Sequence, residues 1–311
     1  MTSPLNWASL QGQLACAASL YGDAGAARVA DWFAQEEGRV DDPGFARLFS
    51  DHICLPGIAS LDYAHRHVSV RAGSLIGGIR FYCQDITRPF VEVIAHDFDD
   101  LTALAQVVSM EWRTFAPQRL RLLVMPGASM PATADLDMSL YAARYGDLSP
   151  PSQEVQLGAF DNPDQAMALI QNRFDMMARE NPAMRCHVSP IPSDKLIEMW
   201  EAEQVHRIAA NGQAVVGLIA AAPGQIGWIA GDEIIEEVVA ICHSGHGYAA
   251  AAQYALSRYH TNRPDTYLIG TIDSLNVASR RSAERAGRKR ILDYVFLPLE
   301  TEAVRSFGNS A

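Results

Sequence analysis

Several features that would place this chain in a specialised class are missing from its 311 residues. No apolar run approaches the roughly 20 residues that a membrane-spanning helix needs, and the longest stretches resemble AVVGLIAAA at 214–222. The amino terminus lacks the basic and then apolar layout of a secretory signal. We therefore expect a cytoplasmic protein with no membrane partner.

Paired cysteines and basic blocks are missing as well. The five cysteines are odd in number and scattered, with no CxxC pair to indicate zinc or a redox centre, so we expect free thiols and no metal. The formal charge is −11, and the most basic block is GRKR at 287–290. This composition argues against a nucleic-acid partner and favours cationic small molecules as ligands.

What remains is the composition of an ordinary globular protein, with 49% apolar and 20% charged residues. The chain is longer than the size at which one hydrophobic core usually stops growing, which predicts two domains. The stretch GDLSPPSQE at 146–154 contains paired prolines and no recurring apolar residue. We place the boundary there, between domains 1–150 and 151–311.

The second half has a regular order of predicted elements. Hydrophobic periodicity predicts a strand at 154–160, helices at 162–181 and 192–203, and strands at 205–212, 214–222 and 233–242. Turns at 211–213 and 222–225 separate the three central strands. A helix at 247–260, a strand at 266–272, a helix at 276–287 and a strand at 289–299 follow. This order predicts an α/β domain with a mixed sheet flanked by helices.

The first half repeats part of this order. Segments 68–81, 89–97 and 120–127 resemble 206–221, 233–243 and 266–273, with offsets of roughly 135 to 150 residues that indicate a diverged duplication. After its second segment, the first half has HDFDD at 96–100. These aspartates either contribute to an acceptor site at the domain junction or cap a helix that begins near Leu101.

The second half instead has a glycine loop at the corresponding point, Ser244-Gly245-His246-Gly247-Tyr248-Ala249. Two glycines in three positions indicate either an unusual backbone conformation or a ligand that approaches the main chain closely. The loop precedes a predicted helix, and a helix N-terminus offers free N–H groups and a favourable dipole to a phosphate.

The loop resembles the signature of the GNAT acetyltransferases, (Arg or Gln)-x-x-Gly-x-(Gly or Ala). The helix at 276–287 resembles a later motif of that family through Asn276, Ser279, Ala283 and Gly287. The resemblance covers residues 155–298 and implies a tandem GNAT-like fold in which only the second half binds acetyl-CoA as co-substrate. It implies cofactor contacts by the six loop residues, by Asn276 and Ser279, and by the main chain at Val239, with Ile241 next on the same face.

Two positions depart from the family pattern. Ser244 stands where the family usually has Arg or Gln, so a charged group is missing from the loop. Many members have a tyrosine seven residues after the asparagine, which protonates the leaving thiolate. Here that position is Ala283, which leaves the role empty or filled from elsewhere; Tyr294 on the last strand is one candidate to approach the thiol.

Two adjacent carboxylates, Glu236 and Glu237, are the candidates for a catalytic base, because an ammonium group must lose a proton before its nitrogen can attack. A strand directs neighbouring side chains to opposite faces. Glu237 shares the parity of Val239, so we favour it as the base, acting through water. Cys242 beside His243 is the alternative as a nucleophile, but neighbours on a strand face apart.

The resemblance implies an acetyl-CoA-dependent N-acetyltransferase that acts on a small primary amine by direct transfer in a ternary complex. The alternatives are an acyltransferase with another acyl chain or with a thiol or hydroxyl acceptor, and a non-catalytic acyl-CoA sensor. A homodimer is possible, and the sequence leaves the oligomeric state open.

Overall fold

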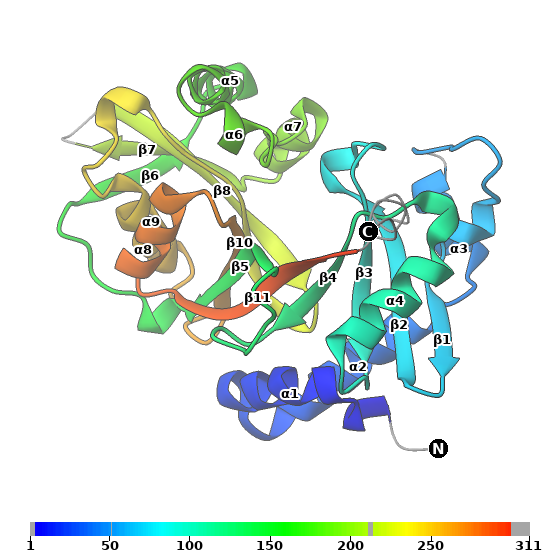
Figure 1. The fold of residues 1–311 in the computed structure, drawn as a ribbon. Coiled ribbons are helices and arrows are strands. Elements are labelled where there is room, and N and C mark those ends of the chain that lie inside the picture. The colour runs from blue at the N-terminus through cyan, green and yellow to red at the C-terminus, as the bar shows by residue number, and fades with distance from the viewer. Residues whose placement is uncertain (1–3, 51, 211–213, 300–311) are drawn as a thin grey trace. The chain divides into compact units, whose positions relative to one another are not determined.

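The computed structural model describes residues 4–50, 52–210 and 214–299. The chain divides into two compact units: unit 1 is Met1–Met138 with Leu292–Ala311, and unit 2 is Ser139–Ile291. Each unit contains a mixed sheet with helices packed against it (Figure 1), which confirms the predicted α/β class. The predicted boundary was residue 150, whereas the units divide after Met138 and again after Ile291.

In unit 1 the strands follow the order β1-β2-β3-β4-β11. All neighbours are antiparallel except β3 and β4, which run parallel. The strands are β1 Arg66–Val70, β2 Gly73–Phe81, β3 Pro89–His96, β4 Arg119–Val124 and β11 Lys289–Pro298. The helices are α1 Ala8–Tyr21, α2 Gly25–Glu37, α3 Pro43–Ser50 and α4 Leu101–Glu111.

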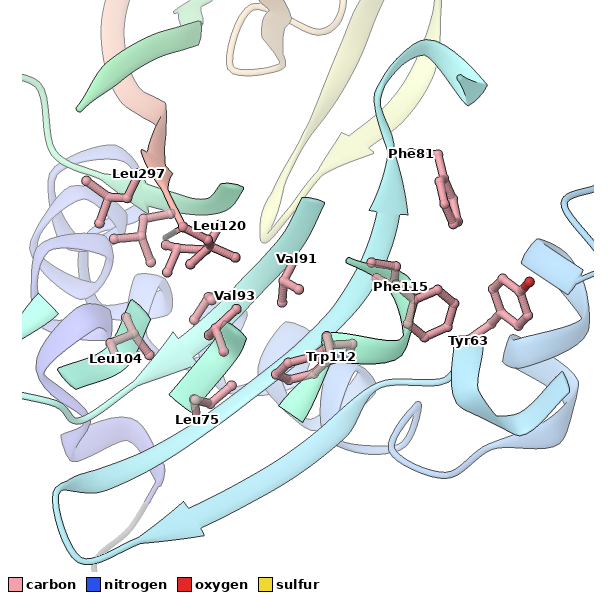
Figure 2. Packing of buried hydrophobic residues seen from close by; sticks show 14 of the residues in the cluster. Tyr63, Leu75, Phe81, Val91, Val93, Leu104, Trp112, Phe115, Leu120 and Leu297 are labelled. Carbon is pink, nitrogen blue, oxygen red and sulfur yellow. The ribbon is translucent and has the colours of Figure 1, made fainter. Parts of the chain in front are cut away.

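The core of unit 1 forms where α4 packs on the strands. Leu104, Val108 and Trp112 are completely buried against strand residues such as Val91 and Leu120 (Figure 2). Leu297 of β11 belongs to the same cluster. The last strand of the chain is therefore part of the first unit's core.

In unit 2 the strands follow the order β5-β10-β9-β8-β7-β6. Neighbours from β6 to β9 are antiparallel, and β9 and β10 run parallel. The strands are β5 Asp135–Arg144, β6 Val155–Ala159, β7 Val205–Ala210, β8 Ala214–Ile226, β9 Ile229–Val239 and β10 Tyr267–Asp273. The helices are α5 Pro163–Glu180, α6 Pro182–Arg185, α7 Ser193–Glu201, α8 Tyr248–Tyr259 and α9 Val277–Arg285.

The helices of unit 2 cover both faces of its sheet. On one face, Phe174 of α5 and Leu196 of α7 pack with Val238 of β9. On the other face, Ala252 and Leu256 of α8 pack with Ile219 of β8. The side on which a β9 side chain emerges therefore determines which helices it meets.

The predicted order of elements in the second half is confirmed, with one difference among the described residues. The turn expected at 222–225 is wrong, because β8 continues through these residues to a turn at Gly227 and Trp228. Pro223 is tolerated there because the pairing of β8 with β7 ends at Ala220, so a missing N–H breaks no bond to that strand. Residues 211–213, the other predicted turn and the end of the predicted 205–212 strand, lie outside the described residues.

The two halves of the sequence exchange a strand. β5 comes from the first half, but from Ser139 onward it belongs to unit 2, where it lies beside β10. β11 comes from the second half, but from Leu292 onward it belongs to unit 1, where Asp293–Pro298 pair with Arg119–Val124 of β4. The sequence pattern misses β5 entirely and cannot indicate this exchange.

Candidate functional site

A cleft of unit 2 opens where β9 and β10 separate. Within the described residues, β9 and β10 pair at two positions, Leu268 with Asp232 and Ile269 with Glu233. Beyond these pairs, β9 continues to Val239 and β10 continues to Asp273. The cleft lies between these strand ends, α5, α8 and α9, and its volume is ≈ 570 Å³. Ligand pockets typically measure roughly 300–1,000 Å³. The diverging strand edges offer backbone groups to an extended ligand.

The glycine loop forms one end of the cleft. Gly245 and Gly247 have φ angles of 83° and 81°, in the left-handed region that suits glycine. A Cβ atom at either position would meet nothing within 4 Å, so the backbone conformation, not crowding, requires these glycines. Gly247 is the N-cap of α8 and supplies no side-chain cap. The first-turn N–H groups of α8 are therefore available to a ligand, and Gly245, Gly247, Tyr248 and Ala249 line the cleft.

The corresponding helix of unit 1 has a different start. Asp100 is the N-cap of α4, and its carboxylate accepts the N–H of Thr102 at 2.8 Å. Asp97 accepts the N–H of Ser74, and Phe98 is buried in the core. Of the two interpretations of the HDFDD aspartates, capping is confirmed for Asp100. A negative charge already occupies the position where an incoming phosphate would bind, so this helix start does not suit an anion.

Helix α9 forms a basic wall of the cleft. Its N-cap is Asn276, whose side chain accepts the N–H of Ser279 at 3.1 Å, and both residues line the cleft. Arg281 and Arg285 lie one helical turn apart and line it too. Within the described ranges, no ion pair or hydrogen bond involves either of their guanidinium groups. The sequence prediction does not include this wall, although the spacing of the arginines in SRRSAER at 279–285 indicates a basic helix face.

Glu236 and Glu237 both line the cleft but emerge on opposite faces of β9. Glu236 has the parity of Val238, which packs with α5 and α7. Glu237 has the parity of Val239, which packs on the α8 side. Both reach the cleft because it passes between the separated strands. The cleft thus has an α5–α7 side with Glu236 and an α8–α9 side with Glu237.

The half-buried carboxylate of Glu236 is held by the segment between α6 and α7. Its Oε2 accepts the N–H of Ile191 at 3.1 Å. Burial and the adjacent charge of Glu237 raise the pKa of Glu236 to about 7, although the N–H groups of Ile191 and Glu237 oppose this shift. A carboxyl group with a pKa near neutrality can accept a proton and release it again at physiological pH.

The carboxylate of Glu237 has a more confined environment. Gln253 of α8 donates from Nε2 to both carboxylate oxygens, at 3.0 and 3.1 Å. Burial raises the pKa of Glu237, and the hydrogen bond from Gln253 and the positive charge of Arg288 oppose the rise. Arg288 is fully buried, and burial lowers its pKa to about 10. Because both of its oxygens are already bonded, Glu237 is less suited than Glu236 to receive a proton from a ligand.

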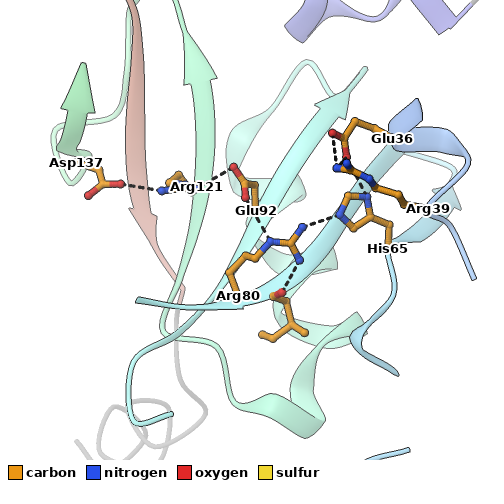
Figure 3. Close-up of polar contacts among 8 residues, drawn as sticks. Glu36, Arg39, His65, Arg80, Glu92, Arg121 and Asp137 are labelled. Carbon is orange, nitrogen blue, oxygen red and sulfur yellow. Dashed lines mark hydrogen bonds and ion pairs between the residues drawn. The ribbon is translucent and has the colours of Figure 1, made fainter. Parts of the chain in front are cut away.

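Unit 1 has a network of ion pairs at the position that corresponds to Glu237 of unit 2. Aligning VEVIAH at 91–96 with EEVVAI at 236–241 places Glu92 opposite Glu237. Glu92 lies between Arg121, at 2.9 Å, and Arg80, at 3.5 Å (Figure 3). Burial opposes its ionisation, but the two arginines outweigh burial and lower the pKa of Glu92. Its charge is therefore neutralised within the protein, and it is not poised as a base.

Four other sequence candidates lie away from the cleft wall. Ile241 and His246 are not among its lining residues, and His246 instead stacks on Tyr248 with ring centroids 5.7 Å apart. Cys242 is exposed and does not line the cleft either. Tyr294 belongs to unit 1, where Arg121 lies 4.6 Å from its ring centroid. The suggestion that Tyr294 approaches the thiol stays a prediction.

The remaining predicted contacts, Val239 and Ser244, line the cleft. The Ser244 hydroxyl donates to the carbonyl of Ile241 at 2.9 Å and so stabilises the loop. Ala283 is completely buried against Tyr141 and Ile272. A tyrosine would not fit at that position without repacking, so this chain has no acid there.

Neither a metal centre nor a membrane span is found in the parts of the chain that the structure describes. No group of three or more His, Cys, Asp or Glu side chains there is arranged to hold a metal ion. None of the helices within the same ranges is long and apolar enough to cross a membrane.

Comparisons with known proteins were made at the levels of sequence and structure. No protein-family model matches the sequence, and no curated protein matches it. Among solved structures, the chain is similar to a GNAT-family acetyltransferase from Colwellia psychrerythraea, with a TM-score of 0.45 and 11% identity over 83% of this chain and 95% of that one. A GCN5-related N-acetyltransferase from Sphaerobacter thermophilus gives a TM-score of 0.45 and 12% identity over 85% and 95%.

A tandem GNAT protein from the clavulanic acid biosynthesis pathway gives a TM-score of 0.44 and 11% identity, covering 89% of this chain and 95% of that one. What the cleft can bind and catalyse must follow from its own residues.

Proposed function

We propose that this protein is an acetyl-CoA-dependent N-acetyltransferase that acetylates a small primary amine by direct transfer in a ternary complex. One observation carries the proposal: the uncapped start of α8 at Gly247 and the carboxylate of Glu236 lie on the same cleft. The first can bind phosphate, and the second can accept a proton. Together they serve a phosphate-bearing acyl donor and an amine acceptor.

The phosphates of coenzyme A fit the α8–α9 side of the cleft. The first-turn N–H groups of α8 can donate to a diphosphate, and the helix dipole favours its charge. Arg281 and Arg285 add positive charge on the same side, in a protein whose formal charge is −11. The pantetheine arm can then extend along the unpaired edge of β9 past Val239, as in the addition of a strand.

Glu236 is the base in this proposal, in place of Glu237, the residue that parity alone favoured. It accepts one proton from the ammonium group of the acceptor, directly or through one water. The freed nitrogen attacks the thioester carbonyl carbon, and the carbon–sulfur bond breaks. The nitrogen then releases its second proton to solvent, so the products are an amide and the thiolate of coenzyme A. The thiolate takes its proton from solvent, since position 283 provides no acid.

Direct transfer agrees with the lining of the cleft. No cysteine is among the described lining residues, and Cys242 lies outside it. The serines on the wall, such as Ser279 and Ser282, have no histidine within hydrogen-bonding distance in the described structure to activate them. A covalent acyl-enzyme therefore has no activated nucleophile here.

The buried Ala283 favours one second candidate, a non-catalytic acyl-CoA sensor, because it leaves the thiolate without a nearby acid. Incubation with acetyl-CoA and a panel of primary amines, thiols and alcohols separates the two functions. We expect release of free thiol with amines, reduced by a factor of about 10² to 10⁴ in Glu236→Gln. It should be retained in Glu233→Gln, a control on the same strand outside the cleft. Tight binding of acetyl-CoA with no thiol release from any acceptor would establish the sensor instead.

A further inference from the structure

The α5–α7 side of the cleft has one positive charge whose role the proposed function leaves open. Arg173 of α5 is half-buried and lines the cleft beside Phe174 and Met177. Throughout the described residues, no hydrogen bond or ion pair involves its guanidinium group. A guanidinium presents a planar fork of N–H donors that matches a carboxylate. Its position therefore suits a ligand with a negative charge.

Arg173 lies on the opposite side of the cleft from the groups proposed to bind the phosphates. Phe174, the next residue along α5, packs with Val238, whose parity is that of Glu236. The loop N–H groups, Arg281 and Arg285 belong to α8 and α9, which border the cleft on the Glu237 side. The phosphates already have positive partners there, and Arg173 faces the acceptor together with Glu236.

We propose that the acceptor is an amino acid-like molecule that carries a carboxylate as well as the reactive amine. The amine lies at Glu236 and the carboxylate at Arg173. Phe174, Met177 and Val188, which line the same side, provide an apolar surface for the rest of the molecule. This proposal rests on the proposed acetyl transfer, and it names the substrate class for that site.

Two features favour a carboxylate over a phosphate on this acceptor. Arg173 is the one cationic side chain on the α5–α7 wall among the described lining residues. One arginine pairs with a carboxylate through two parallel hydrogen bonds, whereas a phosphate carries more charge and usually takes several donors. The ammonium and carboxylate of an amino acid also complement the opposite charges of Glu236 and Arg173, so neither group of the protein is left unpaired.

The test compares matched acceptors, an apolar amino acid such as leucine and the amine that lacks its carboxylate. We expect the wild type to have a higher kcat/KM for leucine, and Arg173→Ala to reduce that value about 10- to 100-fold, the range for losing hydrogen bonds to a charged group. The value for the simple amine should hardly change. Arg179→Ala, on the exposed part of the same helix, is the matched control, and a melting curve checks the fold of each variant.

Calorimetry gives a readout that does not need turnover. Leucine added to protein saturated with coenzyme A should bind to the wild type and to Arg179→Ala but not to Arg173→Ala. If leucine binds in this way but is never acetylated, the acetyl transfer is wrong and the carboxylate site remains. If the simple amine is acetylated as well as leucine, and Arg173→Ala changes neither rate, the carboxylate site is wrong and the transferase remains.

Discussion

The ionisation of Glu236 gives the proposed mechanism a measurable pH dependence. The structure raises its pKa to about 7 through burial and the charge of Glu237. With that pKa, about a tenth of the carboxyl groups are ionised at pH 6 and about nine tenths at pH 8. Because the base must be ionised to accept a proton, turnover should rise about tenfold across this interval and level off above pH 8. A carboxyl group with the ordinary value of 4.5 would give almost no change.

The assay is kcat at saturating acetyl-CoA and amine, measured by thiol release from pH 5.5 to 9. Glu236→Gln should lose turnover by a factor of about 10² to 10⁴, and its residual rate should show no inflection near pH 7. The acceptor amine also titrates, so an inflection that persists in Glu236→Gln belongs to the substrate. Full activity in Glu236→Gln together with an inactive Glu237→Gln would refute the choice of base and restore the parity argument.

Three further results are expected. The raised pKa of Glu236 makes its contribution to stability largest below pH 4.5 and removes it as pH rises through about 7. The unfolding free energy of the wild type relative to Glu236→Gln should therefore fall by up to about 3 kcal/mol between these values, measured by urea denaturation, and a flat difference would contradict the raised pKa. Arg281→Ala and Arg285→Ala should each weaken coenzyme A binding about three- to tenfold, because both side chains are exposed; equal weakening in Arg280→Ala, which lies outside the cleft, would show a general charge effect. Cys242→Ser should retain turnover, since Cys242 does not line the cleft, and complete loss with an intact fold would revive an acyl-enzyme.

Local patterns in the sequence predicted the part of the fold that builds the cleft. The strands before and after the glycine loop, the helix α8 and the helix α9 all lie where periodicity and turn residues place them. Gly245 and Gly247 were recognisable because their backbone conformation requires glycine, and this requirement is a property of the loop alone. Such features depend on neighbours in the chain, so a sequence reveals them.

The strand exchange depends instead on contacts between distant segments. β5 and β11 belong to different halves of the chain, yet each completes the sheet of the other half's unit. Nothing in the alternation of polar and apolar residues states which edge a strand will join. A boundary placed at residue 150 therefore separates β5 from the unit in which most of it lies.

The choice between Glu236 and Glu237 also needed tertiary contacts. Parity correctly puts the two side chains on opposite faces, but it does not predict which residues each carboxylate contacts there. Gln253 and Arg288, which confine Glu237, lie far along the chain from it. The proposed role of Arg173 likewise depends on which face of the sheet α5 packs against, and the sequence does not predict that face.

The central claim is that the start of α8 in unit 2 binds coenzyme A and that α4 in unit 1 does not. Titration calorimetry with coenzyme A tests it most directly. The account predicts one molecule bound per chain and no binding in Gly247→Glu, where a side chain at φ 81° brings a negative charge to the N–H groups. Gly227→Glu, at another glycine with positive φ in the β8–β9 turn, should bind normally. Two molecules bound per chain, or unchanged binding in Gly247→Glu, would contradict the claim.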